Sequence, residues 1–104
     1  MSTPEILQEI KRRVSAVVPT AEVLLYGSYA RGEQGPESDI DLLILVDKSK
    51  VSYEDRKSIT YPLYGLEMDS GIMISPIVLP RAVWDAQHGS TPLFKEVARD
   101  GRRL

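Results

Sequence analysis

Asp39 and Asp41 are the residues of this sequence best suited to chemistry, because two carboxylates separated by a single residue can act together. They open a run of branched apolar residues, 40–46, that predicts a β-strand covered on both faces. Side chains alternate along a strand, so we expect both carboxylates on one face, about 7 Å apart. Two like charges repel there unless a cation lies between them, and magnesium prefers one or two carboxylates together with substrate phosphates. The pair therefore favours a magnesium site over a polar strand end exposed to solvent.

Gly27 and Ser28 lie between a short predicted strand, 23–26, and a segment, 29–33, that predicts one or two helical turns. Glycine lets the backbone turn tightly beside a ligand, and the first N–H groups of the following helix can bind phosphate oxygens. Ser28 adds a hydroxyl, and Arg31 adds a guanidinium one turn later. A Gly-Ser pair alone is usually only a turn. Next to a predicted cation site it indicates a polyphosphate ligand, since the short connection makes the two strands neighbours.

The spacing of these residues resembles the signature of the DNA polymerase β-like nucleotidyltransferase superfamily, and specifically of its minimal, MNT-type members. In that pattern a Gly-Ser pair is followed by ten residues and then by Asp-x-Asp, as Gly27-Ser28 is followed here by Asp39-Ile40-Asp41. The local form, GSYARGE…SDIDLLIL, agrees in detail. In the family the Gly-Ser pair holds the triphosphate of a nucleotide, so the resemblance implies that role for Gly27 and Ser28.

The resemblance also implies the remaining parts of a nucleotidyl-transfer site. Asp39 and Asp41 would bind two Mg²⁺ ions, for which Mn²⁺ could substitute, and would act as the catalytic residues. Ser38 and Arg31 are further candidates for phosphate contact, although a structural ion pair is an open alternative for Arg31. The expected reaction attaches a nucleotidyl group to an acceptor hydroxyl and releases pyrophosphate.

The sequence departs from the family at the third carboxylate, which active members usually carry on a neighbouring strand. Met73 occupies the place where we expect that acid. Glu67 and Asp69 precede the strand and are interpreted as solvated charges, and Ser75 could hold a water but not a metal by itself. Two hypotheses follow. The chain is either a nucleotidyltransferase that transfers a nucleoside monophosphate, AMP by preference, or a catalytically weak or silent nucleotide-binding subunit that acts by binding a helical partner.

The resemblance further suggests a partner. Minimal members are often made beside a small all-helical HEPN-type protein, and some act as antitoxins that attach adenylyl groups to it. The expected partners are therefore a nucleoside triphosphate, most simply ATP, and either a HEPN-type protein or a second copy of the chain. Four basic residues near the C-terminus could face a partner or the triphosphate, or form a solvated helix end: Lys95, Arg99, Arg102 and Arg103.

The elements that must position these residues alternate between helix and strand. Thr3 predicts the cap of a first helix with Pro4 in its first turn. The core face of that helix carries residues at spacings of four, four and three: Ile6, Ile10, Val14 and Val17. A second long helix, 52–68, contains Pro62, which predicts a kink or a break.

The second half of the chain completes the pattern. A strand over 72–79 contains Pro76, which predicts a sheet edge or a bulge, and a short helix over 80–86 carries Trp84 as an anchor. Thr91 and Pro92 predict the start of a last helix. The order predicts an α+β (mixed α/β) fold, a small mixed sheet of three to four strands flanked by helices, as in the polymerase β-like palm. Three further residues are assigned to the core: Tyr64, Met68 and Met73.

The composition limits the function classes further. A chain of 104 residues predicts a single nucleotidyltransferase domain spanning 1–104, and its 42% hydrophobic residues match an ordinary globular protein. A net charge of −2 argues against a dedicated nucleic-acid surface, and the absence of cysteine excludes thiolate chemistry. No apolar stretch is long enough for a membrane span and no signal peptide is evident, so a cytoplasmic protein is expected. His88, the one histidine, is interpreted as a surface loop residue.

Overall fold

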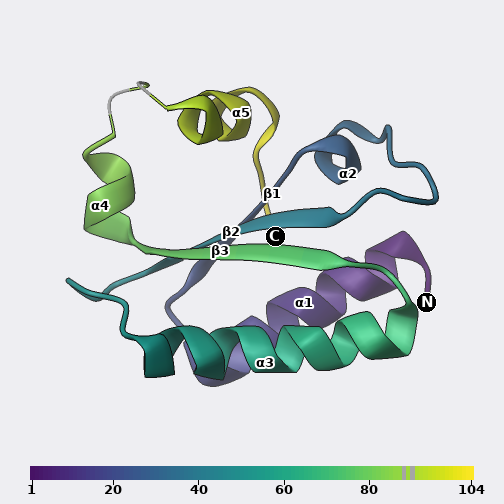
Figure 1. The fold of residues 1–104 in the computed structure, drawn as a ribbon, viewed down its shortest axis with the longest axis horizontal. Helices are drawn as coiled ribbons and strands as arrows, with labels where there is room; N and C mark the ends of the chain where they lie inside the picture. Colours follow the sequence, from purple (N-terminus) through teal and green to yellow (C-terminus); the bar gives the residue numbers. More distant parts are fainter. Residues whose placement is uncertain (88, 90) are drawn as a thin grey trace.

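The computed structural model describes residues 1–87, 89 and 91–104 and places helices on both faces of one sheet (Figure 1). In chain order the elements are α1 (Thr3–Val17), β1 (Glu22–Tyr26), α2 (Ser28–Arg31), β2 (Ile40–Val46), α3 (Tyr53–Ser70), β3 (Ile74–Pro80), α4 (Arg81–Asp85), α5 (Pro92–Asp100) and β4 (Arg102–Arg103). The interpretation of His88 lies outside the described residues. Within the described part of the chain, no helix has the length and apolar character needed to cross a bilayer.

The sheet is mixed, with strand order β3-β2-β1-β4. β1 pairs antiparallel with both β2 and β4, while β2 and β3 run parallel. α1 and α3 lie together on one face of the sheet, and α4 and α5 lie on the other (Figure 1). The predicted α+β fold with a small mixed sheet is therefore confirmed, and β4 is a strand that the sequence did not predict.

β2 is the central apolar strand, and all of its residues from 42 to 46 are buried. Leu43 and Leu45 face α4 and α5, whereas the residues between and beside them face α1 and α3. Burial on both faces fixes the register of the strand, because a shift of one residue would exchange the two sets of side chains. The same alternation places Asp41 on the face of Leu43 and Leu45.

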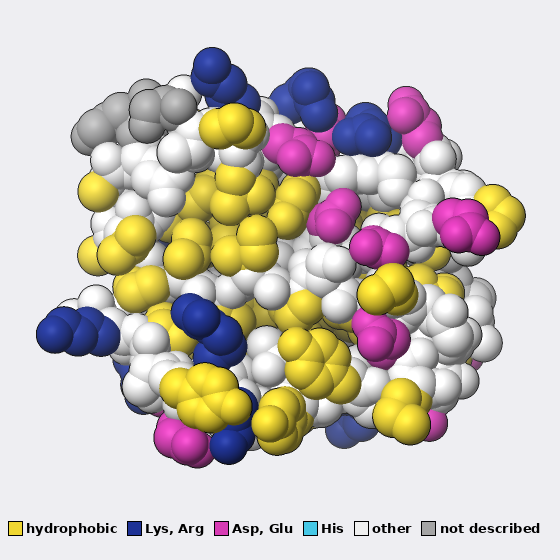
Figure 2. Space-filling view, viewed as in Figure 1, with side chains coloured by type: hydrophobic (Ala, Val, Ile, Leu, Met, Phe, Trp, Pro, Cys, Tyr) yellow, Lys and Arg dark blue, Asp and Glu magenta, His cyan; other side chains and the backbone are white. Residues whose placement is uncertain are grey.

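The sheet face under α4 and α5 is covered less completely than the face under α1 and α3. Its buried cluster is small and consists of Tyr26, Leu43, Leu45, Trp84 and Val97. Several apolar side chains around that cluster remain partly exposed, among them Ile77, Leu79, Leu93 and Phe94. Figure 2 shows hydrophobic side chains gathered below α5 and beside α4, with acidic side chains next to them. Asp41 of β2 thus lies at the more open face.

The N-terminal cap of α1 is Ser2, so the prediction of Thr3 as the cap is wrong. Ser2 Oγ accepts a hydrogen bond from Glu5 N at 3.2 Å, and Ser2 N donates to Glu5 Oε1 at 3.2 Å. This reciprocal pair satisfies two N–H groups at once, which a cap at Thr3 would not have done. Val17 ends the helix and is 37% exposed, so it does not join the core as predicted.

α3 runs without interruption through Pro62, so the break considered at that residue does not occur. A capping box starts the helix, with Ser52 Oγ accepting from Asp55 N at 3.1 Å and Ser52 N donating to Asp55 Oδ2 at 3.1 Å. Pro62 contributes instead to helix packing, because its carbonyl accepts a hydrogen bond of 2.8 Å from Arg13 Nη1 on α1.

Tyr64, Met68 and Met73 are exposed by 44%, 85% and 59%, so their assignment to the core is wrong. The buried positions of α3 are Ile59, Thr60, Leu63 and Leu66. Tyr64 and Met68 lie on the outer side of this helix. Tyr64 directly follows the buried Leu63, and Met68 is two residues beyond the buried Leu66. Trp84, by contrast, is buried and anchors α4 as predicted.

β3 is an edge strand, which confirms the prediction from Pro76. Ile40 N on β2 donates to Met73 O at 2.9 Å, so the next N–H along, that of Ile74, points away from β2. Glu67 Oε1 accepts that N–H at 2.7 Å, and Pro76, two residues further, has no N–H to offer. Glu67 therefore closes part of the edge, and its interpretation as a solvated charge is wrong.

β4 forms the opposite edge and pairs Arg102 with Leu25 and Arg103 with Leu24. The interpretation of these two arginines as a solvated helix end is therefore wrong, although both side chains are exposed. Gly101 allows the turn from α5 into β4, because its N donates to Val97 O at 2.7 Å and a Cβ there would overlap that carbonyl. The end of α5 is consequently held close to β1.

Candidate active site

The glycine turn after β1 lies directly against Asp41, the one acid of β2. Tyr26 is the register partner of Asp41, so the turn that begins at Gly27 lies over the start of β2. Gly27 has φ 75° and ψ −157°, a backbone conformation essentially restricted to glycine. A Cβ on Gly27 would overlap Asp41 Oδ2 and would lie 3.3 Å from Asp41 Cγ. The close approach of this turn and this carboxylate therefore requires glycine at position 27.

Asp39 and Asp41 are brought together on one face of the sheet. Ser75 on β3 is the register partner of Asp41, and its Oγ donates a 3.3 Å hydrogen bond to Asp39 Oδ2. The Asp39 carboxylate therefore lies beside Ser75, the residue of β3 that is paired with Asp41. Both acids are partly buried. The predicted juxtaposition of the paired acids and the glycine turn is what the structure contains.

The electrostatics of this corner are dominated by negative charge. Burial raises the pKa of the Asp41 carboxyl, and the charges of Glu96 and Asp39 raise it further, while Arg31 acts in the opposite direction. Burial and the charges of Asp41 and Glu96 also raise the pKa of Tyr26 to about 12. The charged form of Asp41 is thus disfavoured here unless a cation lies beside it.

The residues of this corner fit a magnesium ion that is shared with a substrate. Its donors are carboxylate oxygens, the ligands that a hard cation prefers, and Asp41 lacks a compensating partner strong enough to restore its usual pKa. Among residues 1–87, 89 and 91–104, no three His, Cys, Asp or Glu side chains converge on one metal position. The two aspartates would therefore hold the ion together with substrate oxygens, the mode that magnesium commonly adopts.

Arg31 is the last residue of α2 and is engaged in ion pairs. Its Nη1 donates to Asp100 Oδ2 at 2.7 Å and its Nε donates to Glu33 Oε2 at 3.2 Å. The structural ion pair that the sequence left open is therefore present. A phosphate contact for Arg31 stays a prediction.

Ser28 and Ser38 occupy different parts of the site. Ser28 is the first residue of α2, next to the turn at Gly27. Ser38 closes the loop before β2, because its Oγ accepts from Gly35 N at 2.9 Å and its N donates to Gly35 O at 3.1 Å. It also lines a cavity of about 270 Å³ that includes Asp39. Because Ser38 Oγ accepts in this bond, its own O–H can still donate to a phosphate. A phosphate contact remains a prediction for Ser28 and for Ser38.

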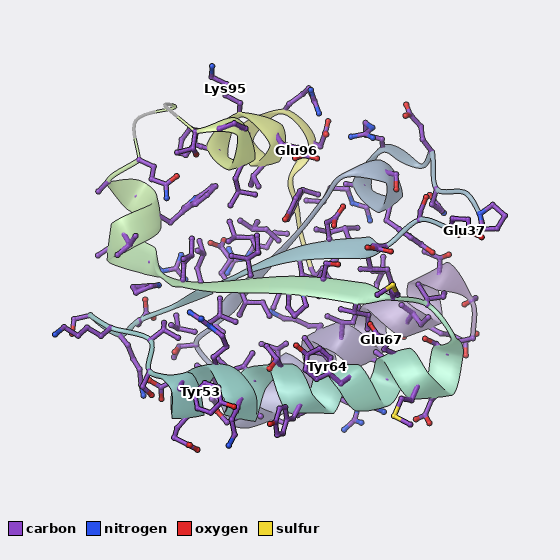
Figure 3. All side chains as sticks on the ribbon, in the orientation of Figure 1. Glu37, Tyr53, Tyr64, Glu67, Lys95 and Glu96 are labelled. Carbon is purple, nitrogen blue, oxygen red and sulfur yellow. The ribbon has the colours of Figure 1, made fainter. Side chains whose placement is uncertain are left out.

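Two further carboxylates, Glu67 and Glu96, lie on opposite faces of the sheet. Figure 3 shows Glu67 on the α3 side and Glu96 on the α5 side. Glu67 is bonded to Ile74 N, and Asp69 is exposed, so neither replaces the acid expected near Met73. Glu96 acts on the pKa of Asp41 more strongly than Asp39 does.

α5 brings Glu96 and Asp100 to this site, which was not predicted from the sequence. The spacing of four residues between Glu96 and Asp100 predicts that they share a helix face. This spacing could be read from the sequence, but the position at which α5 docks on the sheet could not.

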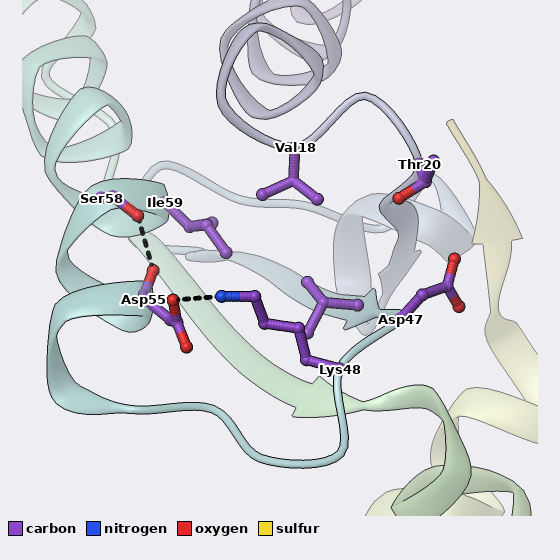
Figure 4. Close-up of a pocket in the computed structure, with 8 residues that line it drawn as sticks. Val18, Thr20, Asp47, Lys48, Asp55, Ser58 and Ile59 are labelled. Carbon is purple, nitrogen blue, oxygen red and sulfur yellow. Dashed lines mark hydrogen bonds and ion pairs between the residues drawn. The ribbon is translucent and has the colours of Figure 1, made fainter.

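A second hollow lies at the other end of β2, and its chemistry is different. It has a volume of about 180 Å³ and is lined partly by Val18, Ile59, Lys48 and Asp55. Lys48 Nζ and Asp55 Oδ1 form an ion pair of 2.6 Å across it (Figure 4). The third charged residue of its lining, Asp47, accepts a 3.0 Å hydrogen bond from Arg81 Nε, so each charge in this hollow has a partner, unlike Asp41 at the Gly27 turn.

The fold and the site define a class of protein. The chain belongs to the nucleotidyltransferase domain family, whose model matches residues 4–79. A protein of Methanocaldococcus jannaschii named "Putative protein adenylyltransferase MJ0141" is 38% identical over 86 residues, which cover 80% of this chain and 85% of that protein. A second protein of the same organism, "Putative protein adenylyltransferase MJ1379", is 42% identical over 45 residues, or 43% of this chain and 45% of its own. The family predicted from residues 27–41 is confirmed.

Solved structures share the fold at low sequence identity. A crystal structure of a toxin–antitoxin with AMP-PNP superposes with a TM-score of 0.63 at 19% identity, covering 98% of this chain and 72% of the other. A mutant of the toxin–antitoxin MntA-HpeT gives a TM-score of 0.59 at 21% identity and covers 100% and 72%. These similarities extend through α5 and β4, which lie beyond the residues matched by the family model.

Proposed function

We propose that this protein is a magnesium-dependent nucleotidyltransferase that transfers a nucleoside monophosphate, AMP in the simplest case, from a triphosphate to an acceptor hydroxyl. The single observation that carries the proposal is the Asp41 carboxylate packed against the Gly27 turn, with Asp39 on the same face. A polyphosphate donor site and a cation site meet at that point. Family membership supports the same reaction class.

The residues of the chain have distinct roles in this proposal. The N–H groups at the start of α2 and the Ser28 hydroxyl bind the triphosphate, which places the α-phosphorus near the aspartates. Asp39 and Asp41 would hold the metal, and Ser75 orients Asp39 through its hydrogen bond. Bound magnesium would neutralise phosphate charge and lower the pKa of the attacking hydroxyl. The acceptor hydroxyl releases its proton to solvent, and its oxygen bonds to the α-phosphorus. The bond between the α-phosphorus and the oxygen that bridges it to the β-phosphorus breaks, and pyrophosphate leaves.

We also propose that the acceptor is a protein hydroxyl. The two M. jannaschii relatives are named as protein adenylyltransferases, and the structures with the same fold are described as toxin–antitoxin complexes. An antitoxin that attaches AMP to a helical HEPN-type partner is consistent with those names. A second copy of this chain is the other acceptor to test.

A second candidate function is a nucleotide-binding subunit with little or no transfer activity. The observation that favours it is Ser75, which stands opposite Asp41 where β3 carries no carboxylate. Such a subunit would bind magnesium and ATP and would act through its partner. It would not label any acceptor.

Transfer from α-labelled ATP separates the two candidates. The protein is incubated with magnesium or manganese and with candidate acceptors, including itself and a HEPN-type protein encoded beside it. Asp39→Asn and Asp41→Asn are expected to abolish labelling, while the exposed Asp69→Asn serves as a matched control and retains it. Magnesium and ATP should also raise the melting temperature of the wild-type protein. A thermal shift without labelling would favour the binding subunit, and no shift at millimolar ligand would contradict both candidates.

A further inference from the structure

Arg31 is held by two carboxylates that come from different parts of the chain. Glu33 follows it by two residues and accepts from Nε, whereas Asp100 lies 69 residues away and accepts from Nη1. A guanidinium carries five N–H donors, so two acceptors leave several donors over. In the described part of the chain, Nη2 of Arg31 makes no hydrogen bond. The side chain is thus oriented but not saturated.

Asp100 is well fixed at the end of α5. Its side chain is only 5% exposed and also accepts bonds from Arg99, whose Nε and Nη2 lie 3.0 and 2.9 Å from the carboxylate oxygens. Its backbone is fixed on both sides, because α5 precedes it and the β4 pairing of Arg102 with Leu25 follows it. Leu25 is two residues before the Gly27 turn, so the tail and the candidate site form one rigid corner.

We infer that Asp100 is a positioning residue that holds the Arg31 guanidinium beside the aspartate pair, with its remaining donors available to the oxygens of a bound triphosphate. The inference rests on the proposed function and assigns a role to α5, which lies outside the residues of the family match. Arg31 N donates a 3.2 Å hydrogen bond to Gly27 O, and Gly27 packs against the Asp41 carboxylate, so Arg31 begins one helical turn from that acid. Without Asp100, Arg31 would be free to pair with Asp41 or to extend into solvent, and either change would weaken triphosphate binding.

Binding of two defined probes tests this role without an acceptor. We would measure the dissociation constants of ATP and of inorganic tripolyphosphate, both with magnesium, by calorimetry. Asp100→Asn should weaken both about tenfold, because one charge-assisted hydrogen bond orients the group that binds phosphate. Equal losses for the two probes are expected because Arg31 meets the phosphates and not the base. Asp100→Glu should restore part of the affinity.

The matched control is Arg99→Ala, which removes the other partner of Asp100 at a side chain that is 67% exposed. Its dissociation constants should stay within about twofold of wild type. A double-mutant cycle distinguishes positioning from general structural support. In an Arg31→Ala background, Asp100→Asn should add little further loss, because its effect passes through Arg31.

The outcomes separate the inference from the proposed function. If the wild-type protein binds neither probe, the proposed function fails. If the wild-type protein binds and Asp100→Asn binds equally or more tightly, the inference alone is overturned. A full loss from Asp100→Asn in the Arg31→Ala background also overturns it, since Asp100 then acts without Arg31. Should Asp100→Asn fail to fold, Arg31→Lys provides the test. Lysine keeps the charge but lacks the planar fork that donates to Glu33 and Asp100 in fixed directions, so about tenfold weaker binding is again expected, and unchanged binding would overturn the inference.

Discussion

The two faces of the sheet differ in how completely they are covered. α1 and α3 pack on one face and bury Ile6, Ile10, Leu63 and Leu66 fully. α4 and α5 cover the other face only in part, and apolar residues of β3 remain partly exposed beside the acids (Figure 2). The closed face has the larger share of apolar burial, which is the main stabilising contribution to folding.

This difference explains where the chemistry can be placed. A carboxylate at the closed face would lose its hydration without a partner, at a cost of several kcal/mol on the scale of buried charges. At the open face, Asp39 and Asp41 remain accessible, and a cation and a triphosphate can reach them. Stability and ligand binding are therefore separated by the two sides of β2, whose residues alternate between them.

The largest effect should come from Gly27→Ala, which fills the contact between the open-face turn and Asp41. The new Cβ overlaps the carboxylate and the backbone is in a glycine-only region, so transfer activity should fall at least about 100-fold, as expected for a displaced reactive group. Labelling from α-labelled ATP measures it. Gly32→Ala is the matched control, because Gly32 has φ 71° but nothing within 4 Å of its added Cβ. Similar activity losses in both variants would mean that backbone strain, and not the contact with Asp41, is responsible.

The stability contributions of the two faces can be compared with two truncations. Leu63→Ala on the closed face should lower the free energy of unfolding by about 2–5 kcal/mol, because Leu63 is fully buried. Ile77→Ala on the open face should cost about 1 kcal/mol, because that side chain is already partly exposed. Urea unfolding followed by circular dichroism gives both values. Equal losses would contradict the difference in coverage.

Acid should destabilise the protein through carboxylates that are paired outside the aspartate site. Arg12 and Arg13 lower the pKa of Glu9 to about 2, Lys48 lowers that of Asp55 to about 2, and Arg99 and then Arg31 lower that of Asp100 to about 2. Each folded pKa lies below the unfolded value of about 4, so this stability is present above pH 4 and is lost as the pH falls through 2.

Melting temperatures between pH 5 and pH 2 test that expectation. The fall should be shallower in Asp55→Asn, which removes one of the carboxyl groups with a lowered pKa. It should also become smaller at high salt, because exposed ion pairs are screened. A melting temperature that is constant across this range would contradict the assignment.

The smallest effect concerns Asp41, for which the sign is reversed. Its folded pKa is raised, so the folded state favours the protonated form and the ionised carboxylate destabilises the protein at neutral pH. Asp41→Asn should therefore raise the melting temperature by a few degrees without divalent cations, while losing the additional rise from magnesium and ATP. Asp69→Asn, at an exposed acid, should change neither. A lower melting temperature for Asp41→Asn would show that burial and like charge do not dominate at this site.

Local signals in the sequence predicted most of the elements and the centre of the site. The branched run of β2, Pro76 in β3 and the Thr91 cap each depend on neighbouring residues, so their structures could be inferred without a fold. The same holds for Asp39, Asp41, Gly27 and Ser28, whose spacing is short. The sequence did not decide which of two adjacent residues, Ser2 or Thr3, caps α1. A capping box depends on a reciprocal hydrogen bond, which composition alone does not show.

Contacts between distant segments were decided only by the tertiary structure. The pairing of β4 with β1 and the bond from Arg31 to Asp100 join residues that are far apart in the chain, and no local pattern encodes which segments will meet. The same is true of Glu96, which approaches Asp41 because α5 docks on the open face. Residue spacing therefore specified the two aspartates and the glycine turn, whereas the packing of α5 specified the charges around them. The physical reason is that side-chain periodicity is a property of a few residues, while docking depends on the burial of whole surfaces.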